Sequence, residues 1–249
     1  MRARPILFMA RFNQKRALCT GGSGRLGTEL KKLLPKALFP SSAVFNVTNH
    51  IQMEKYIRKH RPSTIIHSAA FISPPLIDKD PQKAIGINII ATAALAKLCW
   101  RYKTKLVYIS TDYVFKGDKG NYKEDDPIFP VNKYAWSKLG GECAVNMLDD
   151  YLIIRTSFGE KVFPFQKAFV DHYTSRETVD VIAKKIVTVL KSRVRGTIHL
   201  GHARRSVYQY ATSLGGPTPV GKMSITDVPF RVPKDTSLNT SNYRKYAKK

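Results

Sequence analysis

The chain has 249 residues, enough for one large domain or for a domain with a small lobe. Hydrophobic residues make up 43% of it and charged residues 24%, a composition that excludes a disordered or collagen-like protein. The 42 lysines and arginines outnumber the 18 aspartates and glutamates, and the net charge of +24 exceeds what solubility requires. The scattered basic residues fit either a solvated basic surface or one that meets nucleic acid or another polyanion.

Cysteine usage and hydropathy give two further expectations. The three cysteines stand singly without CxxC spacing, which indicates neither a disulfide framework nor a zinc site. We therefore expect no bound metal and a reducing intracellular compartment such as the cytoplasm. We also expect no membrane span, because no apolar run approaches the ~20 residues that one needs. The basic extension 1–15 reads as an unstructured tail or, as the less favoured alternative, as an organellar targeting segment.

Short apolar runs alternate with helical patterns from Arg16 onward. Strands are predicted at 17–20, 37–39, 64–68, 105–110, 151–155 and 196–200. Helices are predicted at 26–34, 51–60, 87–100, 134–147, 179–190 and 206–214. Strands separated by helices of this length indicate an α/β fold with a Rossmann-like, doubly wound parallel sheet. The proline- and lysine-rich end of the chain is expected to wrap the surface.

A glycine-rich turn, Thr-Gly-Gly-Ser-Gly-Arg-Leu-Gly at 20–27, joins the first predicted strand to the first helix. Its first glycine permits a tight turn, its third lets backbone N–H groups approach a diphosphate, and its last lets the helix pack closely on the strand. This context predicts a dinucleotide site within a domain at 16–157. Residues 158–249 are expected to form a shortened substrate lobe interleaved with the last strands and helices of that domain. The predicted cofactor contacts in the turn are Gly21, Ser23, Gly24, Arg25, Leu26 and Gly27.

The end of the second predicted strand bears on the choice between NAD and NADP. A site that prefers NAD holds the ribose 2′-hydroxyl with an acidic residue there, and residues 38–42 include none. Arg25 and the hydroxyls of Ser41 and Ser42 suit a 2′-phosphate instead, because arginine can pair with it at two points. We therefore expect NADP(H), with NAD(H) as the alternative.

Tyr134 and Lys138 lie one helical turn apart at the start of a predicted helix. An adjacent ammonium favours the phenolate, so we expect it to lower the pKa of the tyrosine and make it a better proton carrier. Thr111, at the end of a buried strand, would hydrogen-bond a substrate carbonyl while Tyr134 donates a proton and a nicotinamide donates hydride. Asn88, in the middle of a helix, fits either a proton relay or packing.

Two longer stretches resemble the extended short-chain dehydrogenase/reductases, and among them the dTDP-4-dehydrorhamnose reductase family. Residues 110–115, Ser-Thr-Asp-Tyr-Val-Phe, resemble that family's strand-end signature, and residues 130–139, Pro-Val-Asn-Lys-Tyr-Ala-Trp-Ser-Lys-Leu, resemble its active-site helix. The resemblance implies an NADPH-dependent reduction of a 4-keto group on a nucleotide-linked 6-deoxy sugar. It also implies that the segment between 157 and 178 is shortened, around Gly159–His172, so that a small, trimmed lobe would hold the substrate.

The resemblance adds candidate contacts to those found in the turn. The cofactor contacts outside the turn are Ser41, Asn46, Val47, Ala69, Ala70, Ser110, Tyr134 and Lys138. The substrate contacts are Phe71, which stands where a tyrosine is expected, together with Thr111, Asp112, Tyr113 and Val114.

Three functions stay open at this stage, of which the sequence favours the first. The protein is an active reductase of a nucleotide sugar, a cofactor-binding regulatory or structural subunit, or an interaction protein that binds polyanions. The second has a family precedent, since the regulatory beta subunit of methionine adenosyltransferase resembles the same reductases. A homodimer or a larger complex is compatible with each of them.

Overall fold

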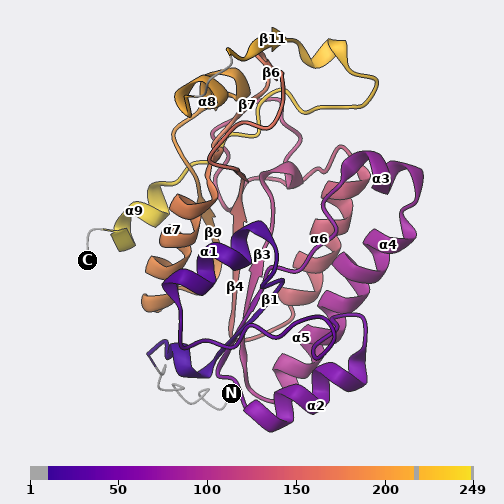
Figure 1. Cartoon of the computed structure of the whole chain (residues 1–249), viewed down its shortest axis with the longest axis vertical. Helices are drawn as coiled ribbons and strands as arrows, with labels where there is room; N and C mark the ends of the chain where they lie inside the picture. Colours follow the sequence, from indigo (N-terminus) through magenta and orange to yellow (C-terminus); the bar gives the residue numbers. More distant parts are fainter. Residues whose placement is uncertain (1–10, 216–218, 248–249) are drawn as a thin grey trace, which may run out of the picture.

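A five-stranded parallel sheet forms the centre of the computed structural model, which describes residues 11–215 and 219–247 (Figure 1). The sheet order is β1-β2-β3-β4-β9 and every neighbouring pair is parallel. The strands are β1 (Ala17–Thr20), β2 (Thr64–His67), β3 (Lys105–Ile109), β4 (Tyr151–Thr156) and β9 (Gly196–Leu200). This sheet, covered by helices on both faces, confirms the predicted Rossmann-like α/β fold. Residues 1–10 of the predicted basic extension 1–15 lie outside the described residues.

The prediction of a strand at 37–39 is wrong. Only Leu38 pairs with the sheet, through two backbone hydrogen bonds of 2.8 Å, from its N–H to the Ala17 carbonyl and from the Cys19 N–H to its own carbonyl. Pro35 and Pro40 flank this position and have no N–H with which to extend the ladder. The bridge still gives β1 a neighbour on the side opposite to β2, so the chain order reverses at β1.

Helices cover the two faces of the sheet because neighbouring residues of each strand point to opposite sides. Ile66 and Val107 pack against α1 (Arg25–Leu33) and α7 (Val179–Lys191), and α9 (Ser241–Ala247) lies on the same side (Figure 1). Ile65 and Leu106 face α2 (His50–His60) and α5 (Ala91–Arg101), and α6 (Lys133–Val145) covers the same side. Burial on both faces explains the continuous apolar runs of β2 and β3.

The predicted helix at 87–100 begins earlier than expected. A continuous helix over 82–101 contains α4 (Gln82–Ala84), a π-helical stretch (Ile85–Ile90) and α5. Within the described ranges it is the one helix long and apolar enough to cross a membrane by length and composition, and 44% of its apolar window is buried inside the molecule. Leu95, Leu98 and Cys99 of α5 are fully or almost fully buried in the core, as in the core helix of a globular domain.

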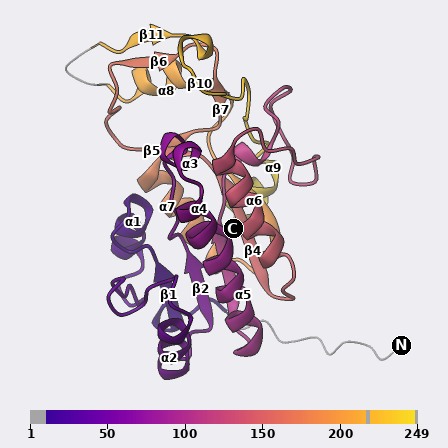
Figure 2. The same cartoon turned by 90° about the vertical axis from the view of Figure 1, so that its right-hand side faces the viewer.

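A small lobe lies at the carboxyl end of the sheet (Figure 2). Its core packs α8 (Val207–Ser213) on β6 (Lys167–Phe169), which pairs with β11 (Gly221–Met223). Short strands make the remaining pairs, β7 (Tyr173–Thr174) with β10 (Arg205–Ser206) and β5 (Phe158–Gly159) with β8 (Glu177–Thr178). The shorter helices elsewhere are α3 (Pro74–Lys79), η1 (Gln14–Arg16), η3 (Asp112–Val114) and η4 (Ile225–Asp227). The described segment between β4 and α7 therefore contains strands and loops but no helix.

The end of the chain does not simply wrap the surface as expected. Thr236, Ser237 and Leu238 are at most 4% exposed. Ser237 accepts a backbone hydrogen bond from Tyr122 at 2.9 Å, and the Thr236 hydroxyl donates to Asp112 at 2.8 Å. Hydrogen bonds of this kind allow a serine- and threonine-rich strap, residues 236–238, to run through the interior.

Candidate active site

The loops that follow the first three strands meet at the edge of the sheet beside the lobe. The glycine turn follows β1, Ser68 to Phe71 follow β2, and Ser110 to Asp112 follow β3. Parallel strands place their carboxyl ends at one edge, and doubly wound sheets bind ligands there, where the strand order reverses. The predicted site residues on these three loops therefore lie at one end of the molecule.

The glycine turn has the geometry that a dinucleotide requires. Gly21 has a φ of 71°, and a Cβ on it would lie 2.8 Å from the backbone nitrogen of Ala69. A Cβ on Gly27 would lie 2.2 Å from the Gly21 carbonyl oxygen, so only glycine lets α1 pack this closely on β1. Gly24 caps α1 with no side-chain hydrogen bond, which leaves N–H groups of the first helical turn available to an anion. The turn thus fits a diphosphate.

Side chains around the turn differ in what they offer to a cofactor. Leu26 is 4% exposed, so only its backbone faces the turn. Arg25 forms a salt bridge with Glu160 at 2.6 Å, and Ser41 lies exposed just beyond Leu38. Ser23 is also exposed, whereas the Ser110 hydroxyl is buried without a hydrogen-bond partner at the carboxyl end of β3. An unpartnered buried hydroxyl at this end of the sheet fits an incoming polar ligand.

Asn46 and Val47, also predicted to contact the cofactor, make contacts within their own loop. The Asn46 side-chain oxygen accepts hydrogen bonds from the Thr48 N–H at 3.0 Å and hydroxyl at 2.8 Å. Val47 packs against the core on the side of α2. Neither residue is brought against the glycine turn by a contact in the described structure.

Lys138 is 3% exposed on α6, which begins after Asn132, whose side chain accepts the N–H of Ala135 at 2.8 Å. Its ammonium lies 4.1 Å from the centre of the Tyr108 ring. Burial lowers the pKa of Lys138 to about 7, and the nearby Glu142 carboxylate opposes that shift. The lysine is therefore close to the balance between its charged and neutral forms at neutral pH.

Tyr134 lies next to Thr111, which is 5% exposed at the end of β3. Burial raises the pKa of Tyr134 to about 12, and a hydrogen bond with Thr111 opposes that rise. The expected net lowering of this pKa by Lys138 is not found, because burial dominates and the charges acting on the phenol are those of Asp112 and Arg176. In this structure Tyr134 thus carries its proton at neutral pH, as a proton donor must.

Asp112 and Val114, which the resemblance assigns to the substrate, are both buried in this structure. The Asp112 carboxylate is 2% exposed and accepts hydrogen bonds from the hydroxyls of Thr111 at 3.2 Å, Thr174 at 2.9 Å and Thr236 at 2.8 Å. Val114 is fully buried in a small apolar cluster. Asp112 therefore positions Thr111 and ties β3 to the lobe and to the terminal strap.

Of residues 112–114, Tyr113 is the one whose side chain lies next to Tyr134. Its ring centre lies 6.4 Å from that of Tyr134 and 5.9 Å from that of His172. Phe71 is half-buried on the loop after β2, with the ammonium of Lys83 4.8 Å from its ring centre. Tyr113 is thus placed as a candidate wall of a substrate site, while Phe71 keeps a partly exposed ring.

Asn88, predicted to serve either a proton relay or packing, makes three structural hydrogen bonds. Its side-chain oxygen accepts the Phe71 N–H, and its amide nitrogen donates to the Phe71 carbonyl and to the Ser137 hydroxyl, each at 2.8 Å. The Ser137 hydroxyl in turn donates to the Tyr134 carbonyl at 2.7 Å. Asn88 thereby fastens the loop after β2 to the helix that carries Tyr134 and Lys138.

Several residues near the site escaped the sequence analysis. His67 ends β2, and its ring lies 2.8 Å from the Thr20 hydroxyl and 3.0 Å from the Thr92 hydroxyl. Burial and the Lys138 ammonium lower the pKa of His67 to about 3. His172 is 2% exposed and its Nε2 has no partner. The available signal was position, since His67 directly precedes the predicted contacts Ala69 and Ala70. Among the described residues no three metal-ligating side chains gather.

Comparison with known proteins places these features in a family. Residues 15–211 match the model of the RmlD substrate binding domain. The dTDP-4-dehydrorhamnose reductase of Aggregatibacter actinomycetemcomitans is 33% identical over 180 residues, which are 69% of this chain and 61% of that protein. Methionine adenosyltransferase 2 subunit beta of Xenopus laevis is 32% identical over 142 residues, 53% of this chain and 42% of that protein. The chain thus spans about three fifths of the length of the first relative and about two fifths of the length of the second.

A solved structure extends the similarity over most of the chain. The crystal structure of dTDP-4-dehydrorhamnose reductase from Bacillus anthracis in complex with NADP superposes with a TM-score of 0.83 at 27% identity. The superposition covers 92% of this chain and 91% of that one. Because the family model matches well over half of the sequence, the chain belongs to the RmlD substrate binding domain family.

Proposed function

We propose that this protein is an NADPH-dependent reductase of a nucleotide-linked 4-keto-6-deoxy sugar. The observation that carries the proposal is the juxtaposition of Thr111 and Tyr134, with Lys138 one turn further along α6, beside a turn that only glycine can form. Related proteins named dTDP-4-dehydrorhamnose reductase support the same substrate class.

NADPH, when bound, supplies the hydride that reaches the keto carbon. Tyr134 holds its proton at neutral pH and donates it to the oxygen of the keto group. Thr111, whose hydroxyl proton would turn from Asp112 to that oxygen, keeps the oxygen within reach of the phenol. Lys138, whose charge is not among those acting on the phenol in this structure, would hold the cofactor from the next turn of the same helix. Asp112 and Asn88 hold the loop and the helix that present these groups.

The cofactor is proposed to be NADP(H), with NAD(H) as the alternative. The Bacillus anthracis relative was crystallised with NADP, and no acidic residue stands at 38–42 of this chain. Backbone N–H groups of the turn would hold the diphosphate, and Ser110 and Lys138 would face the nicotinamide end. Arg25 would meet the 2′-phosphate after leaving Glu160.

The nucleotide sugar needs a cation near the catalytic groups, and Arg176 is our candidate. Its charge opposes the rise that burial causes in the pKa of Asp112, Tyr113 and Tyr134, so it lies within electrostatic reach of the site. Arginine pairs well with phosphate oxygens. We infer that Arg176, from the lobe, contacts the diphosphate of the substrate and that Tyr113 and Phe71 contact its sugar.

We place the protein in a reducing intracellular compartment such as the cytoplasm. Cys19, Cys99 and Cys143 are free, and burial raises the pKa of Cys19 to about 12, which suppresses its thiolate. The alternative of organellar targeting rests on a segment whose first ten residues lie outside the described structure.

Replacing Tyr134 tests the reductase proposal directly. Tyr134→Phe is expected to lower the rate of NADPH oxidation with a 4-keto-6-deoxy sugar nucleotide at least a hundredfold, because the proton donor is lost. NADPH binding, measured by fluorescence titration, is expected to persist. Tyr151→Phe is the control and should keep full turnover, because Tyr151 starts β4 at the amino ends of the strands, away from the candidate active site. An unchanged rate in Tyr134→Phe would falsify the mechanism.

A second candidate function is a cofactor-binding regulatory subunit. It is favoured by the helix-free segment between β4 and α7 and by the similarity to a methionine adenosyltransferase beta subunit. On this alternative the protein binds NADPH, oxidises it with no member of a keto-sugar nucleotide panel, and copurifies in a stable complex with another protein. Turnover with any member of that panel would exclude it.

A further inference from the structure

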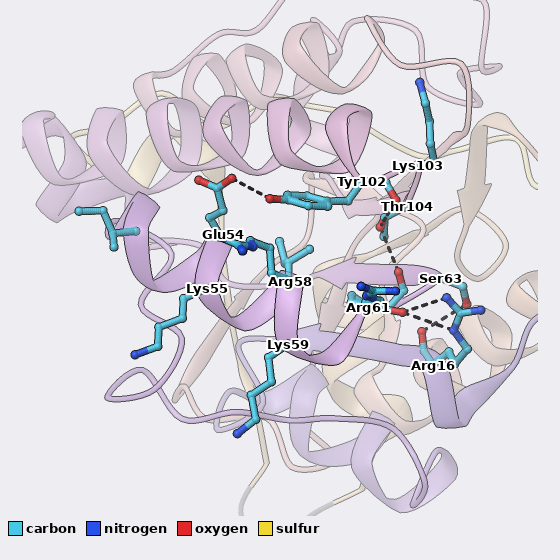
Figure 3. A pocket seen from close by; sticks show the side chains of 13 residues that line it. Arg16, Glu54, Lys55, Arg58, Lys59, Arg61, Ser63, Tyr102, Lys103 and Thr104 are labelled. Atoms are coloured by element: carbon cyan, nitrogen blue, oxygen red, sulfur yellow. Dashed lines mark hydrogen bonds between the residues drawn. The ribbon is translucent and has the colours of Figure 1, made fainter.

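A groove lies at the end of the sheet opposite to the candidate active site. Arg16, Ser63 and Thr104, which directly precede β1, β2 and β3, form its floor, and α2 forms one wall (Figure 3). The volume of the groove is about 1050 Å³. The strands between the two ends have four or five residues, so at ~3.3 Å per residue the groove is roughly 13–17 Å from the strand ends that carry the catalytic candidates.

Basic side chains dominate this groove. The lining includes six exposed cations, which are Arg16, Lys55, Arg58, Lys59, Arg61 and Lys103. Its single acidic residue, Glu54, is already engaged by the Arg101 guanidinium at 2.6 Å and the Tyr102 hydroxyl at 2.7 Å. None of the six cations forms a salt bridge within the part of the chain that the structure describes. Like charges held together without counter-charges repel one another, and a bound anion relieves that repulsion.

Helix stability accounts for only part of this cluster. Arg58 and Lys59 occupy the last turn of α2, where cations interact favourably with the helix dipole. Lys55 sits in the middle of the helix, whereas Arg16 and Lys103 belong to other segments, so the dipole does not explain them. The fold gathers these charges from three separate parts of the chain into one hollow.

We propose that this groove binds the backbone of a single-stranded nucleic acid. Figure 3 shows the ammonium groups of Lys55, Lys59 and Lys103 pointing apart and not toward one point, so the cations suit a chain of phosphates better than a small phosphorylated ligand. An exposed indole outside the groove lining lies beside one of them, Lys103. Trp100 is 60% exposed, with the Lys103 ammonium 4.9 Å from its ring centre, and such a ring offers a base a stacking platform. A hollow lined by cations is also a poor match for a flat lipid surface.

Neutralising one wall of the groove tests the proposal. The probe is a fluorescein-labelled 20-nucleotide oligothymidylate, titrated by anisotropy at several salt concentrations. The triple variant Lys55→Gln, Arg58→Gln, Lys59→Gln is expected to bind at least tenfold more weakly. For this variant the slope of log affinity against log salt concentration should decrease in magnitude by about two, since each of three lost phosphate contacts to a single strand contributes about 0.7.

The control removes the same charge from the other face of the sheet. Lys31, Lys184 and Lys191 are exposed on α1 and α7, and their triple replacement by Gln should change the affinity less than twofold. Equal weakening in both triple variants would overturn the proposal, because the binding would then follow net charge alone. NADPH titration of each variant confirms that the Rossmann core is folded.

Trp100 separates nucleic acid from other polyanions. Trp100→Ala is expected to weaken oligothymidylate binding at least fivefold and to leave the affinity for inorganic polyphosphate unchanged, because only bases stack on the ring. Equal effects on both probes, or no effect on either, would contradict the assignment to nucleic acid. The groove is separate from the proposed reductase site, so failure of this test leaves the reductase proposal intact.

Discussion

Arg25 has one anionic partner in this structure and a second one in the proposed complex. Its guanidinium pairs with Glu160 at 2.6 Å, and the two side chains are 56% and 41% exposed. Exposed pairs of this kind contribute at most about 1 kcal/mol, so a 2′-phosphate with its greater charge would displace Glu160. The salt bridge therefore competes with NADPH for Arg25 but does not compete with NADH, which has no 2′-phosphate.

Removing Glu160 should change the cofactor preference. Glu160→Gln is expected to raise the affinity for NADPH up to about fivefold, the equivalent of about 1 kcal/mol, and to leave the affinity for NADH unchanged. Arg25→Gln should weaken NADPH binding and spare NADH. Fluorescence titration with each cofactor gives both affinities. The control is Asp150→Asn, which breaks an exposed pair with Arg195 far from the site. Equal shifts for both cofactors in Glu160→Gln would show that Arg25 does not bind the 2′-phosphate.

At the scale of elements, the contact between α1 and β1 depends on Gly27. A Cβ there would lie 2.2 Å from a backbone oxygen, which cannot move aside as a flexible side chain would. Gly27→Ala is therefore expected to lower the free energy of unfolding by about 1–3 kcal/mol and to weaken NADPH binding, because α1 must shift away from the turn. Urea denaturation and cofactor titration measure the two effects.

Gly86 provides the matched control for this prediction. It also lies in a helical segment, yet a Cβ on it would meet nothing within 4 Å. Gly86→Ala should stabilise the protein by about 0.5–1 kcal/mol, because alanine loses less conformational freedom in a helix. If Gly27→Ala were as benign as Gly86→Ala, the close packing of α1 on β1 would not be what positions the turn.

Local sequence patterns predicted the elements whose consecutive residues are alike in burial or in backbone requirement. Strands β2 and β3 are buried on both faces and appear as unbroken apolar runs, and the turn at 20–27 shows its role in its glycines. The strand predicted at 37–39 failed because prolines on both sides end its pairing after Leu38. Propensity within the segment could not show this, since Ala37, Leu38 and Phe39 are compatible with a strand.

Long-range contacts account for what the sequence could not predict of the site. Asp112 was assigned to the substrate by resemblance, but its carboxylate is enclosed by hydroxyls 62 and 124 residues further along the chain. The expected effect of Lys138 on Tyr134 followed from their spacing alone. Burial raised the pKa of Tyr134 where a lowering was expected, because desolvation depends on which segments cover the phenol. The proximity of Thr111 to Tyr134 could thus be predicted from sequence, but the protonation states of Tyr134 and Lys138 could not.

At the scale of the whole molecule, three buried histidines make the fold sensitive to acid. His67, His172 and His199 are at most 2% exposed, and burial lowers the pKa of each to about 3. Below pH 6.5 the unfolded chain binds protons at these rings and the folded chain does not. Their contribution to stability is therefore fully present above pH 6.5 and is lost as the pH falls toward 3. The positive charge already carried by the chain adds repulsion as carboxylates become protonated.

His172 is the best of the three for testing this acid sensitivity. Its Nε2 has no hydrogen-bond partner, whereas His67 is bonded through both ring nitrogens and the Nδ1 of His199 lies 3.0 Å from the Tyr122 carbonyl, so His172 can be replaced with the smaller loss of native contacts. Wild type is expected to lose several kcal/mol of unfolding free energy between pH 7 and pH 5 in urea titrations. His172→Leu should reduce that loss by up to about 2 kcal/mol, since one histidine contributes about 1.4 kcal/mol per pH unit below 6.5. The exposed His202, replaced by Gln, should leave the loss unchanged. An identical pH dependence in wild type and His172→Leu would mean that the His172 ring titrates alike in the folded and unfolded chains, and its burial would then not limit stability in acid.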